Sequence, residues 1–178
     1  MPPRPFPLPL RVGIDLCNVP RIKALITKKL NGNKGSLLHA FLSKILTHPE
    51  RSYFRERFGN NESVFRNADN VAHYLAGRFA AKEACRKACD HLGTYTRGFK
   101  HVIILPVTSL DCKEHQSQRP QGLILHEAMP ELENSGGSEP APFDLEALEG
   151  QLCEISITHD GEFASAVALV PSMRDDSP

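Results

Sequence analysis

One alanine-rich segment near the middle of the chain constrains the fold more than any other part of the sequence. It runs from Leu75 to Ala88 and predicts the middle of a helix over residues 68–91, with cap-type residues before it and Gly93 after it. At 100° per residue most of its apolar side chains share one broad face, which the rest of the fold has to cover. The members of this face are Val71, Tyr74, Leu75, Ala81, Cys85, Ala88, Cys89 and Leu92.

Two cations interrupt this apolar face. Arg78 and Lys82 lie one helical turn apart inside it. Such a conflict between residue type and pattern often marks a functional site. The alternative is that both side chains bury their stems and extend their charged ends to the edge of the helix. The periodicity leaves both interpretations open.

The distribution of charge is uneven although the total is zero. The 21 Lys and Arg residues balance 21 Asp and Glu residues, which argues against general nucleic-acid binding. Residues 16–49 contain six basic groups and no acid, whereas residues 127–154 contain eight acids and no Lys or Arg. The basic segment is a candidate docking surface for an acidic partner, and a solvated basic face is the alternative.

The five cysteines (Cys17, Cys85, Cys89, Cys112 and Cys153) are an odd number without a C-x-x-C pair, which favours reduced thiols in an intracellular protein. Cys85 and Cys89 have a spacing that suits a metal, but their apolar neighbours favour packing. No apolar run approaches the ~20 residues that span a membrane, and no secretory signal is visible.

The chain predicts a single domain over residues 10–172, between an irregular proline-rich arm (1–9) and a polar tail (173–178). Residues 111–150 contain a turn-rich, acidic insertion. Helices are expected from Pro20 to Gly32, from Ser36, and from the capping-box segment 47–50, with a polar loop over residues 59–63. Strands are expected over residues 101–105, 122–126, 152–159 and 163–170, the last two joined by a turn at 160–161.

The segment 10–17 predicts the first strand. Leu10, Val12, Ile14 and Leu16 alternate with Arg11, Gly13, Asp15 and Cys17. We expect the apolar set to face the core and Asp15 to lie on the opposite face. Taken alone, Asp15 is then an ordinary solvated strand residue.

Three segments together resemble the AcpS-type 4′-phosphopantetheinyl transferases, the holo-(acyl-carrier-protein) synthases. They are Gly13-Ile-Asp-Leu16, Gly77-Arg-Phe-Ala-Ala-Lys-Glu-Ala84 and Ser156-Ile-Thr-His159, in the order and spacing of that family. The resemblance implies an α+β fold with helices packed against an antiparallel sheet. It also implies transfer of the 4′-phosphopantetheine arm of coenzyme A to a serine of apo acyl carrier protein, with release of adenosine 3′,5′-bisphosphate.

The resemblance assigns roles to individual residues. Asp15 and Glu83 would hold a catalytic Mg²⁺, or Mn²⁺, and a metal-bound water acting through either carboxylate would take the serine proton. Lys82, also assigned to catalysis, would lie against a phosphate. Coenzyme A would contact Arg78, Lys82, Lys87, Thr158 and His159, and Arg21 would face the acidic carrier protein. By spacing alone, Glu83 and Lys87 are equally an ordinary i,i+4 ion pair.

Three positions depart from the family pattern. Asn18 stands where a glutamate is usual, and Cys85 and Arg86 replace an aromatic and a small polar residue. Arg86 would either contact phosphate or crowd the pocket. Two alternative functions are a non-catalytic module that binds carrier protein or coenzyme A, and another metal-dependent phosphotransferase. The sequence has no G-x-x-x-x-G-K loop to support the latter.

The resemblance also implies a homotrimer with active sites between subunits. Apolar strand residues such as Val102, Ile104, Val167 and Leu169 suit either such an interface or an internal core. The proline-rich start and the insertion resemble fungal members that serve the mitochondrial carrier protein. We therefore expect a mitochondrial location, with the cytoplasm as the alternative.

Overall fold

We describe a computed structural model of the chain, covering residues 8–30, 33–89, 92, 98–106, 120–130 and 148–172. Most of the predicted arm and most of the insertion, including Cys112, lie outside these residues, as do the glycine at 93 and the polar tail. Within them, the predicted α+β class is confirmed: helices pack against a five-stranded antiparallel sheet. No helix in the described ranges is long and apolar enough to cross a membrane.

The sheet has the strand order β1-β7-β6-β5-β4, and every neighbouring pair is antiparallel. Its strands are β1 (Leu10–Asn18), β4 (Val102–Pro106), β5 (Pro120–Leu125), β6 (Gly150–Asp160) and β7 (Phe163–Pro171). The predicted turn joins β6 to β7, and Gly161 supplies the positive φ of 53° that this tight turn requires. A short hairpin, β2 (Lys29–Leu30) with β3 (Asn33–Lys34), was not predicted.

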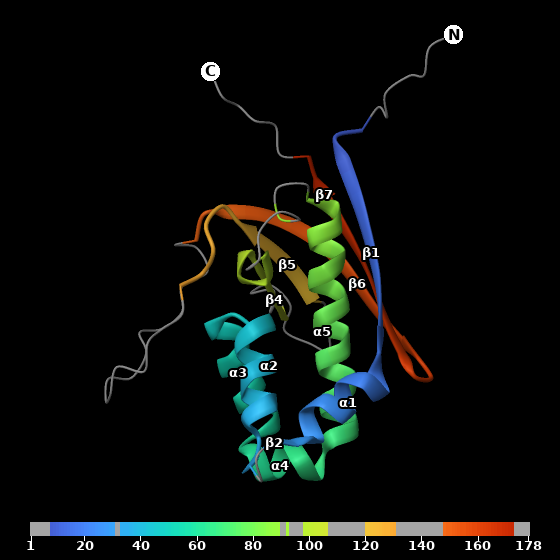
Figure 1. The fold of residues 1–178 in the computed structure, drawn as a ribbon. Coiled ribbons are helices and arrows are strands. Elements are labelled where there is room, and N and C mark those ends of the chain that lie inside the picture. The colour runs from blue at the N-terminus through green and yellow to red at the C-terminus, as the bar shows by residue number, and fades with distance from the viewer. Residues whose placement is uncertain are drawn as a thin grey trace, which may run out of the picture.

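The helices are α1 (Val19–Thr27), α2 (Ser36–Ile45), α3 (His48–Phe58), α4 (Asn61–Arg66) and α5 (Ala68–Ala88), followed by a 3₁₀ turn, η1 (Gly98–His101). In Figure 1, α5 lies against the sheet beside β1 and β7, and α2, α3 and α4 gather beside its N-terminal half. The capping box that begins α3 is confirmed. The expected polar loop instead begins α4, because the Asn60 side chain accepts a hydrogen bond from the Ser63 amide and caps a helix.

Small residues on both surfaces allow α5 to lie directly on β1 and β7. A side chain at Gly13 would place its Cβ 1.9 Å from the carbonyl oxygen of Ala84, so only glycine fits there. Beside it in β7, Ala164, Ala166 and Ala168 are all buried under the helix. This contact fixes the position of α5 relative to β1.

The prediction that the apolar side of β1 faces the core is wrong. Val12, Ile14 and Leu16 are each at least 60 % exposed, whereas Gly13 and Cys17 face α5 and are buried. The reason is the close approach of α5, which leaves room for glycine and alanine but not for larger side chains. Asp15 therefore lies on the helix side of the strand. Val102 and Ile104 are fully buried, while Val167 and Leu169 are partly exposed.

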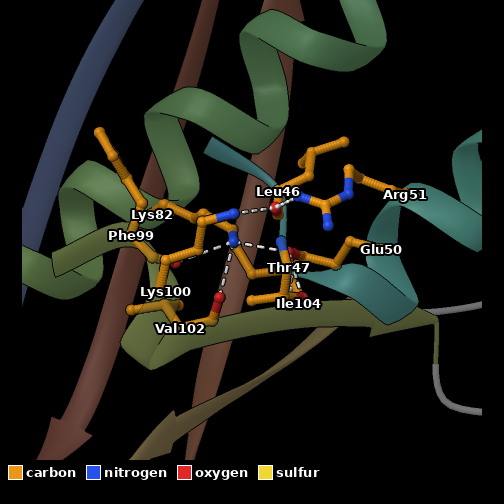
Figure 2. Close-up of polar contacts among 9 residues, drawn as sticks. All are labelled: Leu46, Thr47, Glu50, Arg51, Lys82, Phe99, Lys100, Val102 and Ile104. Atoms are coloured by element: carbon orange, nitrogen blue, oxygen red, sulfur yellow. Dashed lines mark hydrogen bonds and ion pairs between the residues drawn. The ribbon is translucent and has the colours of Figure 1, made fainter. Parts of the chain in front are cut away.

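A buried polar network joins α3, α5 and η1 (Figure 2). The Lys82 ammonium, which is completely buried, donates to Glu50 at 2.6 Å and to the carbonyl oxygens of Phe99 and Val102. Glu50 also accepts hydrogen bonds from the backbone N–H and hydroxyl of Thr47 and from the amide of Ile104. Burial lowers the pKa of Lys82, and the neighbouring carboxylate opposes that effect.

We predict that Lys82→Met destabilises the fold by roughly 3–5 kcal/mol, because it leaves the Glu50 carboxylate buried without its cation. Lys23→Met is the matched control: Lys23 pairs with Asp69 at the same 2.6 Å, but both side chains are exposed. The control should lose no more than about 1 kcal/mol. Urea unfolding measures both, and equal losses would show that burial of the Lys82 pair is not important for stability.

Candidate functional site

Five of the sequence-predicted site residues fall into two groups on different sides of α5. The first, which we call the carboxylate cluster, consists of Asp15, Glu83, Arg86 and Lys87. The second, which we call the arginine pocket, contains Arg78 and His159. Arg78 and Glu83 are five residues apart, which places them about 140° apart around the helix axis.

The carboxylate cluster forms where β1 crosses the C-terminal half of α5. The Lys87 ammonium donates to the Asp15 carboxylate at 2.8 Å and to the carbonyl oxygen of Ile14 at 3.1 Å. Glu83 lies one turn before Lys87 on the same side of the helix. Its carboxylate accepts a hydrogen bond from Arg86 at 2.9 Å. The structure therefore pairs one predicted metal-binding carboxylate, Asp15, with Lys87 and the other, Glu83, with Arg86 one helical turn away.

Arg21 stands beside this cluster. Its exposed guanidinium lies 5.5 Å from the centre of the Phe79 ring, and Phe79 is one turn before Glu83 on α5. Asn18, which departs from the family pattern, accepts a hydrogen bond from the Arg21 amide and caps α1. The structure thus gives Asn18 a structural role.

The arginine pocket has a volume of about 260 Å³. Its lining consists of Tyr53, Arg57, Tyr74, Gly77, Arg78, Pro120, Ile157 and His159. A Cβ at Gly77 would stand 3.2 Å from the Nε2 atom of His159, so the missing side chain gives this imidazole room beside α5. The same nitrogen lies 3.0 Å from the carbonyl oxygen of His73.

Two guanidinium groups in this pocket share one aromatic ring. The Cζ atoms of Arg78 and Arg57 lie 5.0 Å and 5.5 Å from the centre of the Tyr74 ring. Neither arginine forms an ion pair with any residue in the described ranges, and the buried Nε of Arg78 has no hydrogen-bond partner there. Arg78 is only 7 % exposed. Two uncompensated cations around a hollow favour an anionic ligand.

Tyr74 contributes a neutral hydroxyl to the same pocket. Burial raises the pKa of Tyr74, and the nearby Arg78 partly opposes this shift. The hydroxyl is buried and has no hydrogen-bond partner among the described residues. It is therefore a protonated donor available to a ligand.

Lys82 does not reach either group, which corrects the sequence prediction. The sequence assigned it to catalysis and to a phosphate of coenzyme A, but its ammonium is enclosed by Glu50 and two backbone carbonyls. Neither interpretation of its place on the apolar face was right, because it neither binds at the surface nor extends to the helix edge. Its partner Glu50 is 32 residues away in sequence, and the capping-box pattern gave no sign of this second role.

Thr158 also lies apart from the arginine pocket. Successive residues of β6 point to opposite faces, so Ile157 and His159 face α5 while the exposed Thr158 points to the outer face of the sheet. Sequence analysis missed Tyr53 and Arg57 in the pocket. Their spacing of four residues on α3 would have placed them on one helix face, but nothing in the pattern linked that face to Arg78.

Comparisons with known proteins agree with the fold and with the family resemblance. The family model described as "4′-phosphopantetheinyl transferase superfamily" matches residues 11–141. The chain is 33% identical to the mitochondrial 4′-phosphopantetheinyl transferase B of Aspergillus fumigatus, over 93% of this chain and 95% of the relative. It is 32% identical to the holo-[acyl-carrier-protein] synthase of Gluconobacter oxydans, over 92% and 83%.

Solved structures show the same fold. The holo-ACP-synthase of Plasmodium yoelii superposes with a TM-score of 0.50 at 19% identity, covering 90% of this chain and 92% of that one. A coenzyme A complex of the ACPS of Chronobacterium ammoniagenes gives the same score at 20% identity, covering 93% and 98%. The resemblance found in the sequence is confirmed: the chain belongs to the 4′-phosphopantetheinyl transferase superfamily of enzymes.

Proposed function

We propose that the chain transfers the 4′-phosphopantetheine arm of coenzyme A to a serine hydroxyl of an apo acyl carrier protein, releasing adenosine 3′,5′-bisphosphate. One observation carries the proposal beyond family membership. Asp15 from β1 pairs with Lys87 of α5, and Glu83 lies one helical turn before that lysine, with Arg21 exposed over the neighbouring Phe79. Two carboxylates and a lysine gathered in this way would suit the meeting point of a pyrophosphate and a carrier serine, which supports the proposal.

The carboxylate cluster suits Mg²⁺, or Mn²⁺. Hard cations prefer carboxylate oxygens, and Mg²⁺ is typically held by one or two of them together with substrate phosphates. Asp15 and Glu83 supply two, and no three His, Cys, Asp or Glu side chains of the described residues gather at one point. When bound, the cation would offset the charge of the pyrophosphate as its bridging bond breaks.

The other residues of the cluster would orient the reactants. The Lys87 ammonium, about half exposed, can turn from Asp15 toward a phosphate oxygen. We assign removal of the serine proton to Asp15 or Glu83, acting through a water.

The arginine pocket would hold the anionic nucleotide end of the coenzyme. Arg78 and His159 were predicted for this role, and Arg57 and Tyr53 extend the same surface. A phosphate monoester carries the double negative charge that two unpaired guanidinium groups would match. The orphaned Arg78 Nε and Tyr74 hydroxyl supply hydrogen bonds that the protein itself does not satisfy.

We further propose that each complete site combines the carboxylate cluster of one subunit with the arginine pocket of a neighbour in a homotrimer. Within one chain α5 separates the two groups, while Thr158 points to the outer face of the sheet. That face is unusually apolar for a surface, which favours an interface between subunits. Its exposed apolar residues are Val12, Ile14, Leu16, Leu152, Phe163, Val167 and Leu169.

We place the enzyme in mitochondria. The support is the fungal relative whose name includes that location, together with its match over nearly the whole of both chains. Import of a fluorescent fusion of the full chain into mitochondria would test this placement, and a purely cytoplasmic signal would contradict it.

A mass-spectrometric assay tests the reaction. The protein is incubated with Mg²⁺, coenzyme A and an apo carrier protein, and the carrier is weighed. A carrier heavier by one phosphopantetheine arm supports the proposal. Binding of coenzyme A without modification would favour a non-catalytic module, and coenzyme A cleavage without modification would favour another phosphotransferase.

The metal site generates one prediction. Asp15→Ala and Glu83→Gln should each lower transfer by at least about a hundredfold, because each removes a ligand of the cation. Glu62→Gln, which alters an exposed carboxylate on α4, is the control and should keep full activity. Thermal unfolding checks that the variants fold. Near-normal transfer by a folded variant would remove that carboxylate from the metal site.

The proposed contact of Arg21 with the carrier protein generates a second prediction. Arg21→Glu should raise the apparent Michaelis constant for carrier protein about tenfold and leave that for coenzyme A unchanged, because an exposed rim charge mainly affects association. Arg55→Glu reverses another exposed charge, on α3, and should have little effect. Added salt should weaken the wild type more than Arg21→Glu. A loss confined to coenzyme A would instead assign Arg21 to the nucleotide site.

The proposed sharing of the site between subunits generates a third prediction. Glu83→Gln and Arg78→Gln should each be inactive alone. After the two are unfolded together in equal amounts and refolded, about one quarter of the sites in random trimers should hold both intact groups, since each subunit choice has a probability of one half. Recovery of activity toward that level supports the shared site. A mixture that remains inactive, while wild type refolds fully, would contradict it.

A further inference from the structure

The Arg86 side chain is closely packed beside Glu83. Its Cζ atom lies 4.9 Å from the centre of the Phe99 ring, and Phe99 is buried. A side chain at Gly98 would place its Cβ 2.6 Å from the Nε of Arg86, so the glycine provides the space that the guanidinium occupies. The Arg86 side chain is only 20 % exposed. Its ion pair with Glu83 is therefore fixed by packing on the arginine side.

The two cations of the carboxylate cluster differ in their freedom to move. Lys87, which pairs with Asp15, is 55 % exposed and has space to turn away. Arg86 is enclosed by Phe99 and Gly98 and has no such space. A divalent cation approaching the cluster would therefore displace Lys87 from Asp15 more easily than Arg86 from Glu83.

The formal charges of the cluster already balance. Asp15 and Glu83 contribute two negative charges, and Arg86 and Lys87 contribute two positive charges. A divalent cation entering this cluster meets carboxylates whose charge is offset, and like charges a few ångströms apart repel one another. A bound pyrophosphate would restore the negative charge that favours the cation.

We infer that Arg86 competes with the divalent cation for Glu83, so that the cation binds tightly only together with the pyrophosphate of the coenzyme. The inference rests on the proposed metal site and concerns the order in which that site fills. Arg86 is then a positioning residue that acts through Glu83. It makes metal binding depend on coenzyme, which limits occupation of the site by metal alone.

Direct binding of Mn²⁺ to the full chain tests the inference without any turnover. Free Mn²⁺ is counted by electron paramagnetic resonance, with and without coenzyme A. Arg86→Met keeps an unbranched apolar stem but removes the guanidinium that lies over Phe99, and with it the charge. We expect this variant to bind Mn²⁺ alone about three- to tenfold more tightly than wild type. The reason is that Glu83 no longer has to give up a partly buried ion pair in order to bind the cation. With coenzyme A present, the difference should shrink.

Arg66→Met is the matched control. Arg66 forms a helical ion pair with Glu62 at 3.0 Å, close to the 2.9 Å of the Arg86 pair, but on the surface of α4. This variant should bind Mn²⁺ like wild type. Arg86→Lys keeps the charge and should retain weak binding of Mn²⁺ alone, which separates the effect of charge from that of altered packing. Circular dichroism confirms that each variant folds.

Unchanged or weaker Mn²⁺ binding by folded Arg86→Met would overturn the inference, as would an equal gain in the Arg66→Met control. Carrier modification by the wild-type preparation is measured in parallel. If wild type modifies the carrier while Arg86→Met leaves Mn²⁺ affinity unchanged, only the role of Arg86 fails. If wild type does not modify the carrier, the proposed function fails instead.

Discussion

The fold depends on the close approach of α5 to β1, which is possible because neither surface carries a large side chain at the crossing. Gly13 and Ala84 are in backbone contact, and the buried alanines of β7 continue the same smooth surface. This contact brings Lys87 within hydrogen-bonding distance of Asp15, although the two are 72 residues apart in sequence. The carboxylate cluster is therefore a direct product of helix–sheet packing.

The buried pair of Lys82 and Glu50 fixes α5 from its other side. Breaking a pair of this kind is costly because the remaining charge stays buried, so the pair holds α3 and α5 in one relative position. Arg78 is one turn before Lys82 on α5, and Arg57 lies on α3 seven residues after Glu50. The same network that removes Lys82 from the site thus sets the spacing between the two arginines of the pocket.

The sequence predicts local structure well where one pattern dominates. The capping box of α3, the turn between β6 and β7 and the long helix α5 each follow from a short motif, although α5 ends at Ala88 and not at residue 91. The face of β1 was mispredicted because alternation shows which residues share a face but not which face is covered. Burial of Lys82 depended on Glu50, a partner far away in sequence, and no local pattern specifies such a pair. Arg57 was missed for the same reason.

The exposed apolar face of the sheet and the separation of the two groups point to one explanation. A small domain that uses glycine and alanine to bring α5 onto β1 places its larger strand residues, such as Ile14 and Val167, on the outside. Covering them with another subunit removes apolar surface from water, which is the main driving force for association. The same docking would bring groups from a neighbour toward the outer face, where Thr158 is exposed. The packing that forms the carboxylate cluster thus also creates the surface that the proposed trimer would use to complete its site.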